Sequence, residues 1–256
     1  NCFYTKRVSK VMTLNGKLAV VTGASSGIGK AVAERLRDEG MRVIGVDING
    51  DQLAEISGIE HLAVDLSHDE GRAKVVQAGR GAHALVNGAA LIRLKKIREF
   101  TTQDIRDIYA VNVEAPWYLM SHLGEVMSDG GSIVNLSSVS ARLTVTPETA
   151  VYASSKTALL AMTRSWAHVL APRNINVNAI LPGITDTPMQ EHVLHRLSEL
   201  REVPYSDLEA TRLDSIPMKR AAQPEEIAAL VRSLITDEAK YITGQALSQD
   251  GGSVMF

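Results

Sequence analysis

The chain has 256 residues, of which 45% are hydrophobic and 22% are charged, and its formal net charge is −2. This length and composition are typical of one large folded α/β domain. The small net charge argues against a broad basic surface for nucleic acid or anionic lipid, and no apolar run approaches the ~18 residues that a membrane span needs. Cys2 is the only cysteine, so no internal disulfide can form, which fits a cytoplasmic protein.

Residues 1–11 differ in character from the rest of the chain. They include three cations but no apolar run long enough for a secretory signal. Met12 stands shortly before an apolar segment and has the character of a natural start. We therefore expect residues 1–11 to be a leader or a disordered extension, with a short mitochondrial-type extension as the less favoured alternative. Residues 12–256 are predicted to form one domain.

Short apolar segments recur along the chain, and helical patterns lie between them. The apolar segments show no alternation, which is typical of parallel strands that are covered by helices on both faces. The predicted strands are residues 18–22, 42–47, 61–64, 84–87, 132–136, 175–179 and 241–247. The longer predicted helices run from the first glycine-rich turn to about Gly40, over 102–128 with an interruption at Pro116, over 150–170 and over 224–235.

The repeated strand–helix–strand order predicts a single-domain α/β fold. In this Rossmann-type, doubly wound parallel sheet the crossovers are right-handed. The polar and helical segment 189–217 occupies a place where a simple connection is usual. We expect it to form a small helical lid insertion over the site.

A glycine-rich turn, residues 22–29, joins the first predicted strand to the first helix. Gly23 allows a sharp turn, Gly27 leaves room for a pyrophosphate to approach backbone N–H groups, and Gly29 lets the helix pack close to the sheet. The N-terminus of the helix would face the phosphate charge. The turn therefore predicts a dinucleotide site, which also includes Ser25, Ser26 and Ile28.

Acidic residues end the second and third predicted strands. Asp47 can accept hydrogen bonds from the adenosine ribose hydroxyls and would repel a 2′-phosphate, so it favours NAD over NADP as the cofactor. Asp65, which is followed by Leu66, can accept a hydrogen bond from the adenine amino group. For both aspartates the structural alternative is a cap for the helix that follows.

Tyr152 and Lys156 are four residues apart and therefore on one face of a predicted helix. An unperturbed tyrosine has a pKa of about 10, and a nearby cation can lower it by ~1–3 units. Ser138 follows the fifth strand, at the sheet edge where such folds bind ligands. Asn112 lies within a long helical pattern, where a buried amide is costly unless it is used. The four residues predict a proton-transfer site, with a simple surface pair as the alternative for the tyrosine and the lysine.

These motifs, in this order, resemble the short-chain dehydrogenase/reductase family over residues 14–252. The shared positions are Thr22 to Gly29, Asn87, Asn112, Ser138, Tyr152, Lys156, Pro182, Gly183 and Asp250 to Gly252. The resemblance implies hydride transfer between nicotinamide and a secondary alcohol or ketone. It also implies that Tyr152 exchanges the substrate proton and that Ser138 holds the substrate oxygen. Lys156 would bind the nicotinamide ribose and lower the pKa of the tyrosine, and Asn112 would hold a water in a proton relay.

The resemblance implies further cofactor contacts. Asn87 and Gly88 would lie beside the adenosine ribose, although the chain reads Asn-Gly-Ala-Ala where the family usually has Asn-Asn-Ala-Gly. The nicotinamide would be lined by Pro182, Gly183, Thr185 and Thr187. Family members usually form tetramers, so a homo-oligomer is expected by analogy. No metal site is predicted.

Within the family, residues 85–113 and 185–190 resemble enzymes that oxidise a cyclic dihydrodiol acid, 2,3-dihydro-2,3-dihydroxybenzoate, in catechol siderophore synthesis. Such a small-molecule substrate needs a cation opposite its carboxylate. Arg93 and Arg142 lie on loops at the predicted sheet edge and are the candidates, although a solvated loop face is the alternative for each. The lid residues Met189 and Gln190 would close over the ring.

Three other functions are compatible with the sequence. A 3-oxoacyl carrier-protein reductase would share the catalytic residues, and a basic rim extending over Lys95, Lys96 and Arg98 could meet an acidic carrier, but Asp47 argues against its usual NADPH. An NAD-dependent sugar or polyol dehydrogenase also fits. The alternative of another class is a non-catalytic protein that senses a dinucleotide, and the intact Ser–Tyr–Lys–Asn set argues against it.

Overall fold

The computed structural model describes residues 14–143 and 146–255, so the extension predicted for residues 1–11 lies outside the described part of the chain. Seven strands form one sheet, and every hydrogen-bonded pair in it is parallel. The strands are β1 (Leu18–Thr22), β2 (Arg42–Asp47), β3 (Glu60–Ala63), β4 (Ala84–Asn87), β5 (Ser132–Leu136), β6 (Asn176–Pro182) and β7 (Ala246–Gln249). The predicted α/β class and parallel sheet are confirmed.

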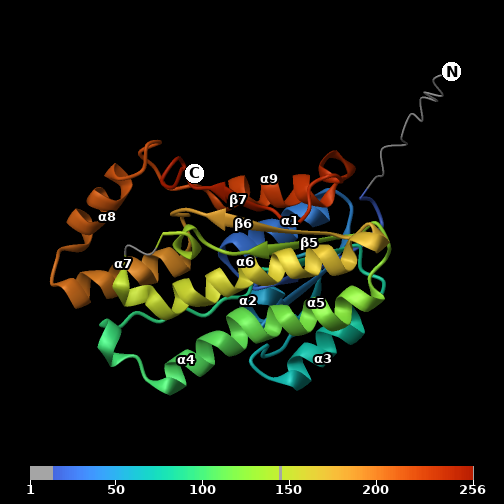
Figure 1. The fold of residues 1–256 in the computed structure, drawn as a ribbon, viewed down its shortest axis with the longest axis horizontal. Helices are drawn as coiled ribbons and strands as arrows, with labels where there is room; N and C mark the ends of the chain where they lie inside the picture. The colour runs from blue at the N-terminus through green and yellow to red at the C-terminus, as the bar shows by residue number, and fades with distance from the viewer. Residues whose placement is uncertain (1–13, 144–145, 256) are drawn as a thin grey trace.

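The strand order is β3-β2-β1-β4-β5-β6-β7, so the chain builds outward from β1 to one edge and then from β4 to the other. The helices that pack on this sheet are α1 (Gly27–Asp38), α2 (Gly50–Ala54), α3 (Asp69–Ala78), α5 (Ala115–Val126), α6 (Ala150–Leu170) and α9 (Pro224–Ile235). Helices α1 and α9 pack side by side on one face, and α3, α5 and α6 cover the other (Figure 1). The reversal between β1 and β4 leaves room at the carboxyl ends of these strands, where doubly wound sheets bind ligands.

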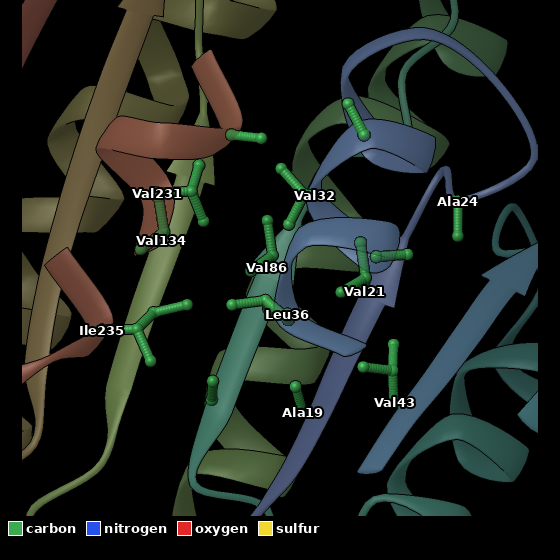
Figure 2. Packing of buried hydrophobic residues seen from close by; sticks show 14 of the residues in the cluster. Ala19, Val21, Ala24, Val32, Leu36, Val43, Val86, Val134, Val231 and Ile235 are labelled. Atoms are coloured by element: carbon green, nitrogen blue, oxygen red, sulfur yellow. The ribbon is translucent and has the colours of Figure 1, made fainter. Parts of the chain in front are cut away.

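A dry apolar layer joins α1 and α9 to the sheet. Figure 2 shows Leu36 of α1 and Val231 of α9 directed toward the strands, where Val86 of β4 lies. All three side chains have no exposed surface. Burying side chains of this size stabilises a fold by about 1.5–3 kcal/mol each, so this layer holds α1 and α9 against the strands.

The predicted helix over 102–128 is interrupted before Pro116. Helix α4 (Thr102–Tyr109) passes into a π-helical turn, Ala110–Glu114, and α5 follows it. Pro116 lies in the first turn of α5, where a missing N–H group is tolerated. The π-turn inserts one extra residue into the helical path, and it contains the fully buried Asn112.

The last strand is shorter than its predicted range of 241–247 and begins at Ala246. Tyr241 is fully exposed, and Gly244 has a φ of +71° that no strand residue adopts. The Ile242 carbonyl accepts hydrogen bonds from the side-chain amides of Asn176 and Asn178. Side-chain amides therefore provide the hydrogen bonds to the Ile242 carbonyl, and the pairing of β7 with β6 begins only after the turn.

The segment 189–217 is helical, as predicted. It forms α7 (Pro188–Arg201) and α8 (Tyr205–Asp214), which extend away from the sheet as a pair at the left of Figure 1. Leu197 of α7 and Leu208 of α8 are buried with Leu94, which lies on the loop after β4. The pair is therefore anchored over the carboxyl ends of the strands. Within residues 14–143 and 146–255, no helix is both long and apolar enough to span a membrane.

Candidate active site

A single long cleft of about 880 Å³ follows the carboxyl ends of the strands. The predicted residues that line it are Gly23, Ser25, Ser26, Gly27, Ile28, Gly29, Asp47, Asp65, Leu66, Gly88, Arg93, Tyr152, Lys156, Pro182, Thr187 and Met189. The other predicted residues, which are absent from its lining, are Asn87, Asn112, Ser138, Arg142, Gly183, Thr185 and Gln190. The strand ends thus gather most of the predicted site, although these residues are far apart in the sequence.

The glycine-rich turn has the tight geometry that its sequence predicts. Gly23 has a φ of +71°, and a Cβ atom there would lie 2.7 Å from the Ala89 backbone nitrogen. A Cβ atom on Gly29 would lie 2.0 Å from the Gly23 carbonyl oxygen, so only glycine allows the start of α1 to lie this close to the turn. The first N–H groups of α1 have no partner within the helix, and Gly27 and Ile28 line the cleft. This end of the cleft can therefore accept an anionic group such as a pyrophosphate.

Asp47 stands at the end of β2 and faces the cleft. Its two carboxylate oxygens accept hydrogen bonds from the backbone N–H groups of Ser25 and Asn49, each at 3.0 Å. The carboxylate is thus held in place beside the glycine-rich turn, with acceptor capacity left for a ligand. The residue that follows, Ile48, is neutral and also lines the cleft.

Asp65 lies across the cleft, at the end of β3. Its Oδ1 accepts a hydrogen bond from the Ser67 backbone N–H at 2.7 Å, which is the capping geometry of the structural alternative. Burial raises the pKa of Asp65, but the hydrogen bonds from Ser67 and the nearby His68 and Arg72 together outweigh it, so the pKa is lowered and the group remains anionic. Capping does not exclude a ligand contact, because a carboxylate has several acceptor positions.

Tyr152 and Lys156 come from α6, one turn apart, and both reach the cleft. The Ser138 hydroxyl forms a hydrogen bond with the Tyr152 side chain. The Lys156 ammonium is 5.6 Å from the centre of the Tyr152 ring, and its Nζ donates to the Leu136 carbonyl at 2.8 Å. The predicted cluster of serine, tyrosine and lysine is therefore assembled at the end of β5.

Burial dominates the protonation of this cluster. It raises the pKa of Tyr152 to about 12, against the weaker opposing effect of the hydrogen bond with Ser138. It also lowers the pKa of Lys156 to about 8. The predicted lowering of the tyrosine pKa by the lysine is not seen in the protein alone. The reason is geometric, because the ammonium group is held by the Leu136 carbonyl and lies beside the ring.

Asn112 is buried in the π-turn, and its side-chain amide is fully engaged. Its Oδ1 accepts from the Leu91 N–H at 2.8 Å, and its Nδ2 donates to the Leu91 carbonyl and to Ser155 Oγ at 3.0 and 2.9 Å. The amide therefore ties the loop after β4 to α6 beside Tyr152. The carbonyl of Asn112 lacks an α-helical donor four residues ahead, since residue 116 is proline.

Asn87 lies beneath the cleft, and its side chain points into the sheet. Its Nδ2 donates to the Oδ1 of Asn135 at 2.7 Å. The adjoining backbone approaches the cleft instead, and the N–H groups of Gly88 and Ala89 donate to the Thr22 hydroxyl. Sequence reasoning predicts this stretch as cofactor-binding, and the structure brings Gly88 to the cleft while Asn87 supports the strand beneath.

The segment after β6 closes one wall of the cleft. Thr187 caps α7 by accepting from the Gln190 N–H at 3.2 Å, and its methyl group would lie 3.1 Å from a Cβ atom on Gly27. Met189 lines the cleft, whereas Gln190 lines a separate cavity between α7 and α8. Of the two lid residues predicted to contact substrate, the structure therefore brings only Met189 to the cleft.

The two arginines predicted to bind a carboxylate are already engaged. The guanidinium group of Arg93 lies 2.7 Å from Asp104 and 2.6 Å from Asp107, both on α4. Arg142 donates to Ser248 Oγ and to the Ala246 carbonyl, both on β7. Arg93 thus reaches the cleft as part of an ion cluster, and Arg142 is turned toward the sheet edge.

Several cleft residues escape the sequence analysis. They include Ile48, Ala89, Ala90, Leu91, Arg106, Val111 and Ser137. The apolar ones have no chemical signature, and Val111 is marked only by its neighbour Asn112. Arg106 is an exposed cation on α4 that lines the cleft, and no spacing in the sequence separates it from an ordinary surface arginine.

Comparisons with known proteins show similarity to oxidoreductases along nearly the whole chain. A model of a family described as "Enoyl-(Acyl carrier protein) reductase" matches residues 23–254. The chain is 34% identical to 3-oxoacyl-[acyl-carrier-protein] reductase FabG of Thermotoga maritima, over 95% of this chain and 100% of that protein. It is 32% identical to galactitol 2-dehydrogenase of Agrobacterium fabrum, with the same coverage. Among solved structures, L-sorbose reductase from Gluconobacter frateurii complexed with NADPH and L-sorbose has a TM-score of 0.86 and 31% identity, over 96% of this chain and 100% of that one.

Proposed function

The chain belongs to the short-chain dehydrogenase/reductase family, and we propose that it is an NAD-dependent dehydrogenase of a secondary hydroxyl group in an uncharged polyhydroxylated compound. The observation that carries this proposal is the cluster of Ser138, Tyr152 and Lys156, in which Tyr152 and Lys156 line the cleft and Ser138 is hydrogen-bonded to Tyr152. A hydroxyl group held by Ser138 can pass its proton to Tyr152, and the remaining length of the cleft has the donors and acceptors for a dinucleotide.

The residues fit a nicotinamide dinucleotide in three places. The N-terminus of α1 offers N–H groups to a pyrophosphate, and Asp47 offers a carboxylate to a ribose. Lys156 offers an ammonium group to the second ribose. When bound, the nicotinamide ring supplies the acceptor or donor for the hydride. All other steps fall to the side chains of the protein.

In the oxidising direction, the hydroxyl O–H and the carbinol C–H bonds break as the C=O bond forms. Tyr152 accepts the hydroxyl proton, and Ser138 holds the substrate oxygen in line with the phenol. In the reducing direction, Tyr152 returns the proton to the oxygen. The Asn112 carbonyl, which has no α-helical donor, is placed to hold a water for proton exchange with solvent.

The phenolate of Tyr152 needs a nearby positive charge, because burial raises the pKa of its phenol to about 12. Lys156 can supply this charge at neutral pH, since its pKa is about 8 and most of it is protonated at pH 7. Reduction, which requires the protonated phenol, should therefore continue at neutral pH. Oxidation should increase with pH up to about 8, the pKa of Lys156, above which the lysine loses the charge that supports the phenolate.

Asp47 supports NAD as the preferred cofactor. A fixed carboxylate at the ribose end pairs with hydroxyl groups and repels a 2′-phosphate, and neither Ile48 nor Asn49 provides a compensating cation. We predict that Asp47→Asn narrows the preference for NAD over NADP, measured as the ratio of kcat/KM values. Equal use of both cofactors by the wild-type protein would contradict this assignment, as would a ratio that the substitution leaves unchanged.

The state of the two arginines predicted to bind a carboxylate bears on the nature of the substrate. The dihydrodiol acid expected from the sequence requires a cation for its carboxylate, but the two arginines predicted for this role are engaged, Arg93 by Asp104 and Asp107 and Arg142 by two groups on β7. A neutral polyol needs no such cation. Two of the proteins that resemble this chain are named for galactitol and for L-sorbose, which supports the same choice.

The proposal is tested by following NAD reduction with three substrates. They are a hexitol, 2,3-dihydro-2,3-dihydroxybenzoate and a 3-hydroxyacyl thioester. We expect turnover with the hexitol, and loss of ~10²–10⁴-fold in Tyr152→Phe with unchanged NADH affinity, because only the proton-transfer group is removed. Turnover of the dihydrodiol acid or the thioester alone would overturn the substrate class and keep the dehydrogenase. Tight NADH binding without turnover of any substrate would favour the dinucleotide-sensing alternative.

A further inference from the structure

Arg72 of α3 is a buried arginine behind one wall of the cleft. Only 5% of the residue is exposed, and it is not among the residues that line the cleft. Its Nε donates to the Leu66 carbonyl at 2.7 Å, and its Nη2 donates to the Ser67 carbonyl at 3.1 Å. Both Leu66 and Ser67 do line the cleft. The guanidinium group therefore holds the loop after β3 from behind.

The same guanidinium group also reaches a second segment of the cleft lining. Its Nη2 donates to the Ala110 carbonyl at 2.9 Å and to the Glu114 carboxylate at 3.3 Å. These two residues begin and end the π-turn, and both line the cleft. One planar group thus bridges two segments that are more than 40 residues apart in the sequence and that both line the cleft.

We propose that Arg72 is a positioning residue that sets the separation of the two walls between which the adenine end of the dinucleotide binds. We call this part of the cleft the adenine slot, with Leu66 and Ser67 on one wall and Ala110, Val111 and Glu114 on the other. The inference rests on the proposed function, because it assigns this part of the cleft to adenine.

The shape of the side chain explains why arginine stands here. A guanidinium group offers five N–H donors in a fixed fork, so it can serve both walls at once. Its charge is balanced by Asp69, at 2.9 Å, and by Glu114. A lysine would keep the charge, but its single ammonium nitrogen cannot occupy the Nε and Nη2 positions together. Arg72→Lys therefore removes the bridge while it retains a buried cation.

The bridge also bears on the π-turn. The Ala110 carbonyl accepts from Arg72 and from the Ala115 N–H, which is the wide hydrogen bond that defines the turn. The Asn112 amide lies within this turn and holds the Leu91 backbone. A shift of the turn would therefore move Ala110 and Val111, which line the adenine slot.

The test compares ligand fragments by calorimetric titration of the full-length protein. ADP probes the adenine end, reduced nicotinamide mononucleotide probes the other end, and NADH probes both. For Arg72→Lys and Arg72→Met we expect Kd to rise about tenfold for ADP and NADH, and to change less than twofold for the mononucleotide. A general loss of structure would weaken both fragments alike.

Arg173 provides the matched control. It also clamps backbone carbonyls, those of Gly124, Glu125 and Met127, but at the end of α6 near the amino ends of the strands. Arg173→Lys should lower the melting temperature and leave the three Kd values within twofold.

Three outcomes would count against the idea. Wild-type ADP affinity in Arg72→Lys would overturn the inference alone, and so would equal weakening by Arg173→Lys. Should Arg72→Met fail to fold, the lysine variant decides. A wild-type protein that binds neither ADP nor NADH would instead overturn the proposed function, and the inference with it.

Discussion

Lys156 carries a cost in stability that can be measured apart from its role at the site. The residue is 2% exposed, and burial lowers the pKa of its ammonium group from 10.5 to about 8. The unfolded chain therefore binds more protons than the folded one between these pH values, so the free energy of unfolding should rise with pH across that window. At pH 7 the buried charge costs about 3 kcal/mol relative to the neutral amine.

Lys156→Met removes this cost at a similar side-chain volume, but it leaves the Leu136 carbonyl without its ammonium donor, which costs about 1–3 kcal/mol. The variant and the wild type should therefore differ little in their free energy of unfolding at pH 7, whereas this difference should depend strongly on pH. We expect the variant's stability relative to wild type to fall by about 2 kcal/mol from pH 7 to pH 9.5, as the wild-type lysine loses its charge.

The assay is urea unfolding of both proteins at the two pH values and at one protein concentration, followed by circular dichroism. Lys74→Met is the control, because Lys74 is an exposed residue paired with Glu70, and its stability difference from wild type should not change with pH. A difference between Lys156→Met and wild type that stays constant within about 0.5 kcal/mol would refute the reasoning. The variant should also lose turnover at both pH values.

Other predictions follow from the packing of the site. Asp104 accepts hydrogen bonds from Lys95, Thr101 and Arg93 that hold its pKa well below the usual range. Asp104→Asn should therefore lower the melting temperature at pH values above about 4, and the difference from wild type should shrink as the pH falls below 4, as measured by scanning calorimetry. Gly29→Ala would place a Cβ atom 2.0 Å from the Gly23 carbonyl oxygen, so NADH binding should be lost, as titrated by fluorescence. Gly124→Ala is its control, since the first contact of the added Cβ is an ordinary 3.4 Å and alanine favours a helix by about 1 kcal/mol; its stability should be unchanged or higher.

The sheet could be predicted from the sequence because its strands are buried on both faces. Such strands read as short apolar runs, and the first five predicted segments match the observed strands to within one residue at each end, whereas the sixth strand runs three residues beyond its predicted end. The seventh range begins five residues too early. Thr243 and Gly244 read as part of an apolar run there, but the turn that they form depends on two asparagine amides of the neighbouring strand, β6. No local pattern contains that information.

The residues of the candidate site also fall into two groups, those that a local sequence pattern predicts and those that depend on contacts distant in the sequence. The glycine-rich turn is visible in the sequence because the backbone leaves no room for a Cβ atom at Gly23 and Gly29. The tyrosine and lysine are visible because they share a helix face. The partners of Arg93 are not visible, because Asp104 and Asp107 lie on a helix whose docking sets their distance from it. From the sequence alone, an arginine on a loop is therefore predicted to be available for a substrate carboxylate. Only the position of α4 in the fold shows that Arg93 is already paired.

Three buried polar side chains show how the loops at the carboxyl ends of the strands, which have no strand partners, are fixed in place by hydrogen bonds. Asn112, Arg72 and Lys156 are at most 5% exposed, and all three donate to backbone carbonyls of segments at the carboxyl ends of β3, β4 and β5. Burial of such groups is unfavourable unless their hydrogen bonds are made, so each of these bonds is costly to break. The segments that they join are the ones that line the cleft. Polar groups whose burial is unfavourable in itself therefore fix the walls of the site. Buried polar groups depart from the usual apolar interior, and such departures are expected at functional sites.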